Sequence, residues 1–205
     1  MKHLVLFCTA FLFIIQNIQA QSKQELSATL SRDLQDYKRY TLELKFDSSL
    51  RYMPAKMFEI VPFDTLKESM IKSMDNEYMS IQMTQFEYDP KKKPKIKKAG
   101  EYYWAYVAYS GSMRLTIKGE EDFKKILIPI LKEQFGAKNV QMEGESIMNI
   151  ALRNKEIIAF KDPALPNWSL IEDKRGEPGP EGEQQKALFS AIMPPDVLKA
   201  VDGKR

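Results

Sequence analysis

The stretch that decides the fold class is EYYWAYVAYSGSMRLTIKG, residues 101–119. Over its first half, apolar side chains fill both alternating sets of positions: Tyr103, Ala105, Val107 and Tyr109 in one set, and Tyr102, Trp104, Tyr106 and Ala108 in the other. Successive side chains of a β-strand point to opposite faces of the sheet. A strand that is apolar on both faces is covered on both sides, so we expect a long central strand here.

Further strands are expected before and after this one. Residues 78–89 alternate between apolar and polar side chains, which predicts a strand. Four more are expected after the central strand, at residues 139–144, 146–152, 156–162 and 166–173. Gly144-Glu145 and Asn154-Lys155 are good turn sequences, so we expect turns to separate the first three of these strands.

Helices are expected at residues 24–44, 54–61, 62–74, 120–136 and 184–201. The first has apolar residues at spacings of three, four and seven, which is the pattern of an amphipathic helix: Leu26, Leu30, Leu34, Tyr37 and Leu44. Pro129 should kink the fourth helix and Gly136 should end it. Pro194-Pro195 should break the last.

Helices followed by a meander of strands predict an α+β domain, with N-terminal helices packed on the concave face of a curved antiparallel sheet. The helix at 120–135 is then an insertion among the strands. We divide the chain into a signal peptide at 1–20, an α+β domain at 21–175, and an acidic Gly/Pro-rich loop with a C-terminal helical tail at 176–205. Strands and helices do not alternate and no glycine-rich phosphate loop follows a strand, so a nucleotide-binding α/β fold is not expected.

Parts of the chain resemble the NTF2-like (cystatin-like α+β) superfamily: LRYMPAKMFEIVPFDTLKESM at 50–70, the aromatic strands, and IIAFKDPALPNWSLIED at 157–173. The residues that carry the resemblance are Tyr52, Pro54, Phe58, Glu59, Pro62 and Trp168. The resemblance spans residues 24–173, and within the superfamily the chain is similar to exported bacterial proteins of that type. The resemblance implies a cone-shaped cavity between helices and sheet, which some members use as isomerases or dehydratases and others use to bind or dimerise. The helix at 120–135 departs from the simplest superfamily order.

The first residues, MKHLVLFCTAFLFIIQNIQA (1–20), have the anatomy of a secretory signal. A short basic start precedes an apolar run from Leu4 to Ile15, and Ile18-x-Ala20 is an acceptable cleavage pattern. The run is short for a bilayer span. We therefore expect cleavage between Ala20 and Gln21, export to the periplasm or out of the cell, and no stable membrane span after processing.

Loss of this segment would remove Cys8 and His3, the single cysteine and the single histidine of the chain. The processed chain would then have no disulfide, no Cys/His zinc site and no nucleophile activated by histidine. We assign no metal, no cofactor and no catalytic residue, while chemistry by Asp, Glu, Tyr, Lys or Arg stays open. The formal net charge of +3 gives no global signature for a polyanion partner.

A lysine run is the strongest local charge feature: Lys91, Lys92, Lys93, Lys95, Lys97 and Lys98. It could attract an anionic head group or a cell-wall polymer. The alternative is a solvated hairpin tip whose charges discourage pairing at a sheet edge. The run lacks the interleaved aromatics and the arginines that nucleic-acid recognition uses, so nucleic acid is not an expected partner.

Candidate ligand-binding residues come from the central strand and from one short helix. Tyr103 and Tyr109 share a strand face, and either phenol could be the polar group of a cavity; Tyr102 and Tyr106 on the other face are the alternative. Aromatic side chains in a strand also suit a packed core. Glu59 has apolar neighbours in the sequence and is the candidate acid of a carboxylate–tyrosine enzyme, with an exposed helix position as the alternative.

Three functions follow from these features. The first is a non-enzymatic exported domain that binds a small apolar ligand or a protein partner, or forms a homodimer through its sheet. The second is an isomerase or dehydratase-type enzyme that uses Asp or Glu with Tyr in a cavity. The third is attachment to an anionic polymer through Lys91–Lys98. The missing catalytic residue types and the two-sided central strand favour the first.

Overall fold

The computed structural model describes residues 22–176 and 180–203 of the chain. The expected signal peptide, with the cleavage site at Ala20 and Gln21, lies outside the described residues. Within the described ranges the chain has seven α-helices and one antiparallel sheet of six strands, which confirms the α+β class. None of the helices in these ranges is long and apolar enough to cross a membrane.

Two long antiparallel strands form the centre of the sheet, β3 (Tyr102–Ile117) and β5 (Ile147–Lys161). Each pairs with two further strands on its outer edge: β1 (Met79–Tyr88) and β2 (Lys97–Ala99) on β3, and β4 (Val140–Glu143) and β6 (Ser169–Glu172) on β5. The strand predicted at 101–119 is therefore central, as expected. Its two faces enter different cores, because Val107 packs in one cluster and Trp104 in another.

The prediction of two strands at 146–152 and 156–162 is wrong, because β5 is one strand. Asn154 lies inside it with φ of 53°, at a shift in the register between Tyr109 and Gly111 of β3. Asparagine tolerates this left-handed backbone conformation. The residue that favours a turn in isolation is instead part of a β-bulge, which bends a strand without ending its pairing.

Four α-helices and a 3₁₀ turn precede the sheet: α2 (Lys23–Leu42), α3 (Phe46–Ser49), η2 (Leu50–Tyr52), α4 (Met57–Ile60) and α5 (Phe63–Met74). Ser22 and Glu25 form a capping box at the start of α2. The expected apolar stripe is buried at Leu26, Leu30 and Leu34. Leu44 does not belong to it, because α2 ends at Leu42 and Leu44 is 37% exposed.

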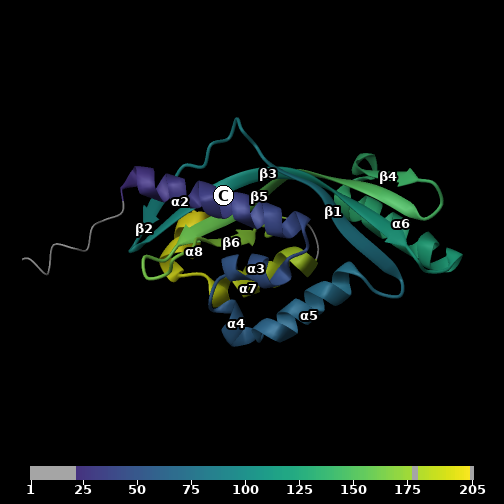
Figure 1. Ribbon diagram of the computed structural model, residues 1–205, viewed down its shortest axis with the longest axis horizontal. Helices are drawn as coiled ribbons and strands as arrows, with labels where there is room; N and C mark the ends of the chain where they lie inside the picture. Colours follow the sequence, from purple (N-terminus) through teal and green to yellow (C-terminus); the bar gives the residue numbers. More distant parts are fainter. Residues whose placement is uncertain (1–21, 177–179, 204–205) are drawn as a thin grey trace, which may run out of the picture.

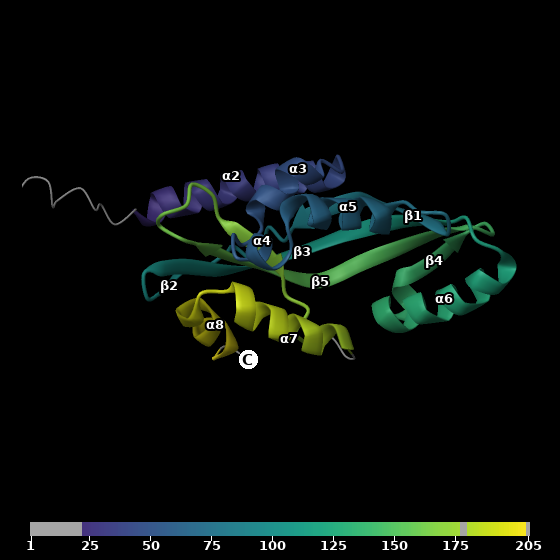
Figure 2. The same cartoon turned by 90° about the horizontal axis from the view of Figure 1, so that it is seen from below.

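The remaining helices are α6 (Glu121–Phe135), the short 3₁₀ turn η3 (Ala137–Asn139), α7 (Pro180–Ile192) and α8 (Pro195–Asp202). As expected, α6 lies between β3 and β4 in the chain and stops before Gly136, which is its C-cap. Pro129 lies inside the helix. Figure 2 shows α2, α3 and α5 on one side of the sheet and α6, α7 and α8 on the other. The sheet is therefore covered on both faces, and not on one concave face alone.

The C-terminal helices are a layer of the fold. Phe189 of α7 and Val197 of α8 are fully buried, in one cluster with Trp104 of β3 and Ile158 of β5. On the opposite face, Leu26, Leu30 and Leu34 of α2 pack with Val107, Ile157 and Trp168. A third cluster lies under α6, where Leu131 meets Leu115 and Met148. The segment predicted as a tail thus covers the second face of the central strand.

Candidate functional site

The connection between β1 and β2, residues 89–96, crosses a gap in the edge of the sheet. The pairing of β1 with β3 ends at Tyr88 opposite Tyr109, and the pairing of β2 begins at Lys97 opposite Trp104. The connection therefore passes beside residues 105–108 of β3, and Figure 1 shows it rising between β1 and β2 next to α2. The lysine-rich segment is thus an arch over an open sheet edge and not the tip of a tight hairpin.

The six lysines of the run fall into two groups. Lys97 and Lys98 lie in β2, where the Lys97 ammonium is 5.5 Å from the centre of the Trp104 ring. The others are exposed in the connection: Lys91, Lys92, Lys93 and Lys95. Over the described parts of the chain these four form no ion pair. Their charges are therefore available to a ligand or to solvent.

The connection has a defined shape because its first residues form a hydrogen-bonded turn. The Asp89 N–H donates to the Ala108 carbonyl at 3.0 Å, and the Lys91 N–H donates to the Asp89 carboxylate at 2.9 Å. This is the local side-chain to backbone pattern by which aspartate stabilises turns. Pro90 and Pro94 restrict the backbone further. A wall that is ordered before binding lowers the entropic cost of holding a ligand.

A groove of 510 Å³ lies between this connection and α2. Leu30 and Leu34 of α2 and Val107 of β3 line its apolar side, and Pro94 and Ile96 line it from the connection. Small ligands occupy pockets of about 300–1,000 Å³ with mostly apolar linings and a few polar groups. The polar groups of this groove are Ser27, Ser31 and Gln35 on the α2 rim, and Asp89, Lys92 and Lys93 on the opposite rim.

Tyr88 holds α2 against the sheet at this groove. Its hydroxyl donates to the Leu34 carbonyl at 2.7 Å, which joins β1 to the middle of α2. Burial raises the pKa of the Tyr88 phenol well above its ordinary value. Tyr88 itself lines the groove, so this bond sets the distance between the two walls.

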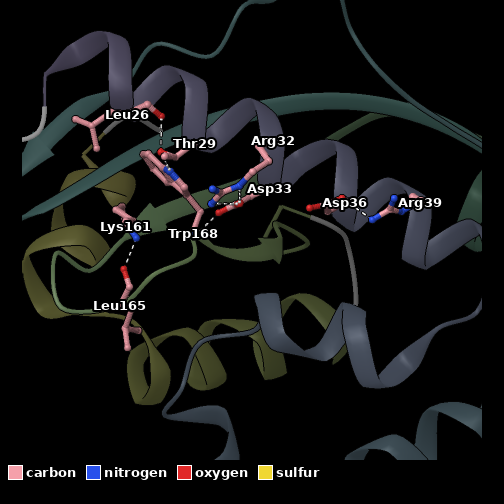
Figure 3. Close-up of polar contacts among 9 residues, drawn as sticks. All are labelled: Leu26, Thr29, Arg32, Asp33, Asp36, Arg39, Lys161, Leu165 and Trp168. Atoms are coloured by element: carbon pink, nitrogen blue, oxygen red, sulfur yellow. Dashed lines mark hydrogen bonds and ion pairs between the residues drawn. The ribbon is translucent and has the colours of Figure 1, made fainter.

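On its other flank, α2 is held by a buried carboxylate that the sequence did not reveal as special (Figure 3). Asp33 is fully buried, and one of its oxygens accepts the Trp168 N–H at 2.8 Å. The other oxygen accepts Nε and Nη2 of Arg32 at 3.0 and 2.8 Å. The indole N–H of Trp168 donates to Thr29 at 3.1 Å. These bonds attach the connection between β5 and β6 to α2.

Lys161 completes this polar cluster. Its side chain is buried and donates to the Leu165 carbonyl (Figure 3). Burial lowers the pKa of Lys161, and the negative charge of Asp33 acts in the opposite direction. Because both Asp33 oxygens are engaged and the residue has no exposed surface, we assign this cluster to the positioning of α2 and not to chemistry.

The structure separates the residues predicted to bind a ligand. Tyr109 is buried, its hydroxyl donates to Glu172 at 2.7 Å, and its ring stacks on Phe86 with centres 4.6 Å apart. Tyr103 is half-buried and packs against the cluster of buried residues between α2 and the sheet. Glu59 is exposed on α4. The three do not share a cavity, and the groove was missed because its walls come from segments far apart in the sequence.

A second hollow, of 470 Å³, lies on the other side of the same connection. It is lined by Lys91, Lys92, Lys93, Lys95, Pro90, Tyr106, Ala108 and Glu156. Lys92 and Lys93 therefore border both hollows, whereas Lys91 and Lys95 border only the second of the two. Replacing Lys92 and Lys93, or Lys91 and Lys95, removes two positive charges from the same connection in each case, but only the first pair lines the groove. The two double variants are therefore matched for testing the groove.

Partly buried phenols packed between α2 and the sheet predict a loss of stability in alkali. Burial raises the pKa of Tyr37 to about 12 from an ordinary 10.0, and the charge of Glu172 adds to the effect. A raised folded-state pKa leaves stability unchanged below about pH 10 and lowers it as the pH rises through about 12. We expect the free energy of unfolding in urea to fall over this interval, and to fall less in Tyr37→Phe. Tyr78→Phe is the control, because Tyr78 is 52% exposed; equal slopes for all three proteins would contradict the prediction.

Within residues 22–176 and 180–203, no group of three or more His, Cys, Asp or Glu is placed to hold a metal ion. Comparison of the chain with protein-family models, with curated protein sequences and with solved structures finds no match. The groove and the charges at its rim are the features of the described residues that bear on function.

Proposed function

We propose that this chain is an exported, non-enzymatic binding domain of the NTF2-like α+β kind, which holds a small apolar ligand in the groove between α2 and residues 89–96. The observation that carries the proposal is the groove itself, with Leu30, Leu34 and Val107 along one side and a preordered wall on the other. The NTF2-like assignment is supported by N-terminal helices packed on an antiparallel sheet. The helices on the second face distinguish this chain from the simplest form of that fold.

The position of the groove differs from the central cavity that the family resemblance implies. The space between α2 and the sheet is filled by Leu26, Trp168, Phe86 and Tyr109, all nearly or fully buried. A ligand is therefore accommodated at the sheet edge, where β1 and β2 leave β3 uncovered. Apolar contact there would remove ligand surface from water, which is the main favourable term for such ligands.

The alternative of a carboxylate–tyrosine enzyme is less well supported. Glu59 is exposed, and Asp33 is ion-paired with Arg32 at 2.8 Å. Glu172 accepts the Tyr109 hydroxyl, but its other oxygen lies 3.9 Å from the Lys174 ammonium. An acid catalyst must line the pocket that holds the reacting group, and none of these three carboxylates lines the groove.

The proposal predicts that filling the groove weakens the binding of an apolar probe. N-phenylnaphthylamine is uncharged and fluoresces when it enters an apolar site, so titration with it measures occupancy directly. Ser31→Trp places an indole over the groove from the exposed rim of α2. This substitution should lower the affinity for the probe at least about tenfold. Ala28→Trp is the matched control, because Ala28 is exposed on α2 and does not line the groove.

Both variants should unfold in urea at the same midpoint as the parent chain, since each new indole projects from an exposed position. If the parent chain does not bind the probe, or if the two tryptophan variants lose equal affinity, the groove is not the binding site and the proposal fails.

A further inference from the structure

The charges around the groove are unequally distributed. Lys92 and Lys93 stand on the rim formed by the connection, and the α2 rim opposite them has Ser27, Ser31 and Gln35, which are uncharged. The one carboxylate in the lining, Asp89, already accepts the Lys91 N–H and so stabilises the turn. One side of the groove therefore has two exposed lysines beside the Asp89 carboxylate, while its floor is apolar.

We infer that the ligand of this groove is a single-chain anionic amphiphile, with its head group at Lys92 and Lys93 and its chain against Leu30, Leu34 and Ile96. The inference rests on the proposed function and adds the substrate class. An uncharged apolar molecule would use the floor but gain nothing from the two ammonium groups. A hydrophilic anion would use the ammonium groups but gain nothing from the floor. An anionic amphiphile matches both parts of the lining at once.

The head group is a carboxylate or a phosphate monoester, since either is an anion that accepts hydrogen bonds from lysine. Exposed charge pairs contribute modestly and are screened by salt. The apolar chain should therefore supply most of the affinity, and the two lysines should supply the preference for a charged head. This partition is what the experiment measures.

The test is displacement of N-phenylnaphthylamine from the full chain by three dodecyl compounds below their micelle concentrations. Dodecanoate and dodecyl phosphate should displace the probe at about five- to tenfold lower concentration than dodecanol, and added salt should reduce this preference. The relative strength of the two anions distinguishes a carboxylate ligand from a phosphate ligand. In Lys92→Gln/Lys93→Gln the preference for the anions should disappear, while dodecanol binds as before.

The control is Lys91→Gln/Lys95→Gln, which removes the same charge from the same connection at positions that line the other hollow. It should keep the preference for the anions. If dodecanol matches the anions in the parent chain, or if the two double variants lose the preference equally, the head-group inference is overturned while probe binding still supports the groove. If the probe binds and none of the three compounds displaces it, the amphiphile class is excluded. If the probe itself does not bind, the proposed function fails.

Discussion

Replacing Asp33 with alanine is expected to lower the free energy of unfolding by about 3 kcal/mol. The change removes the acceptor of the Trp168 backbone N–H. This donor is buried, and Trp168 lies 135 positions from Asp33 in the sequence. An unsatisfied buried donor costs about 1–3 kcal/mol, and the loss of a charged acceptor adds to that. Arg32 limits the total, because its side chain is 57% exposed and regains water when its partner is lost. Urea unfolding followed by tryptophan fluorescence measures the change.

Asp36→Ala is the matched control on the same helix. Asp36 pairs with Arg39 at 2.7 Å in an exposed i, i+3 contact (Figure 3), and such pairs contribute about 0.3–0.5 kcal/mol. Asp33→Asn should have an intermediate effect, because its amide oxygen still accepts the Trp168 N–H although the charge is lost. If Asp33→Ala and Asp36→Ala are equally stable, Asp33 does not hold the β5–β6 connection to α2.

Replacing Phe189 with alanine is expected to cost about 3–5 kcal/mol, the usual range for a phenylalanine removed from a core. Phe189 is fully buried in the cluster that contains Trp104 and Val197, and the Arg175 guanidinium lies 4.8 Å from the centre of its ring. Whole domains are stable by only about 5–15 kcal/mol, so this single change should remove much of the total. Calorimetry or urea unfolding gives the value.

The same experiment shows whether α7 and α8 unfold together with the sheet. We expect one transition in both the parent chain and Phe189→Ala, because these helices cover Trp104 and Ile158 of the two central strands. Ile126→Ala is the control, since Ile126 is 65% exposed on α6 and its loss should change stability by less than about 0.5 kcal/mol. Two separate transitions, or a stability of Phe189→Ala equal to that of the control, would mean that the C-terminal helices are dispensable.

The candidate site shows which parts of the molecule were predictable. The lysine run that includes Lys92 and Lys93, and the stripe of α2 that includes Leu30 and Leu34, were both visible as sequence patterns; Lys92, Lys93, Leu30 and Leu34 are the members that line the groove. That they line one groove was not, because the connection and α2 are brought together by the sheet and by the bond from Tyr88 to Leu34. Tyr109 was predicted as a ligand residue or as core, and its burial against Phe86 and its bond to Glu172 support the core interpretation.

By itself, the sequence determined the α+β class, the central strand around Val107 and the helices at α2 and α6, because these depend on side-chain periodicity within a few turns or strand positions. The tertiary structure decided what periodicity does not contain. It made β5 continuous through Asn154, since pairing with β3 outweighs a local turn preference, and it buried Asp33 by supplying the Trp168 backbone N–H from a distant segment. Local patterns follow from neighbouring residues, whereas the burial of a charge and the walls of a groove depend on groups that meet only when the chain has folded.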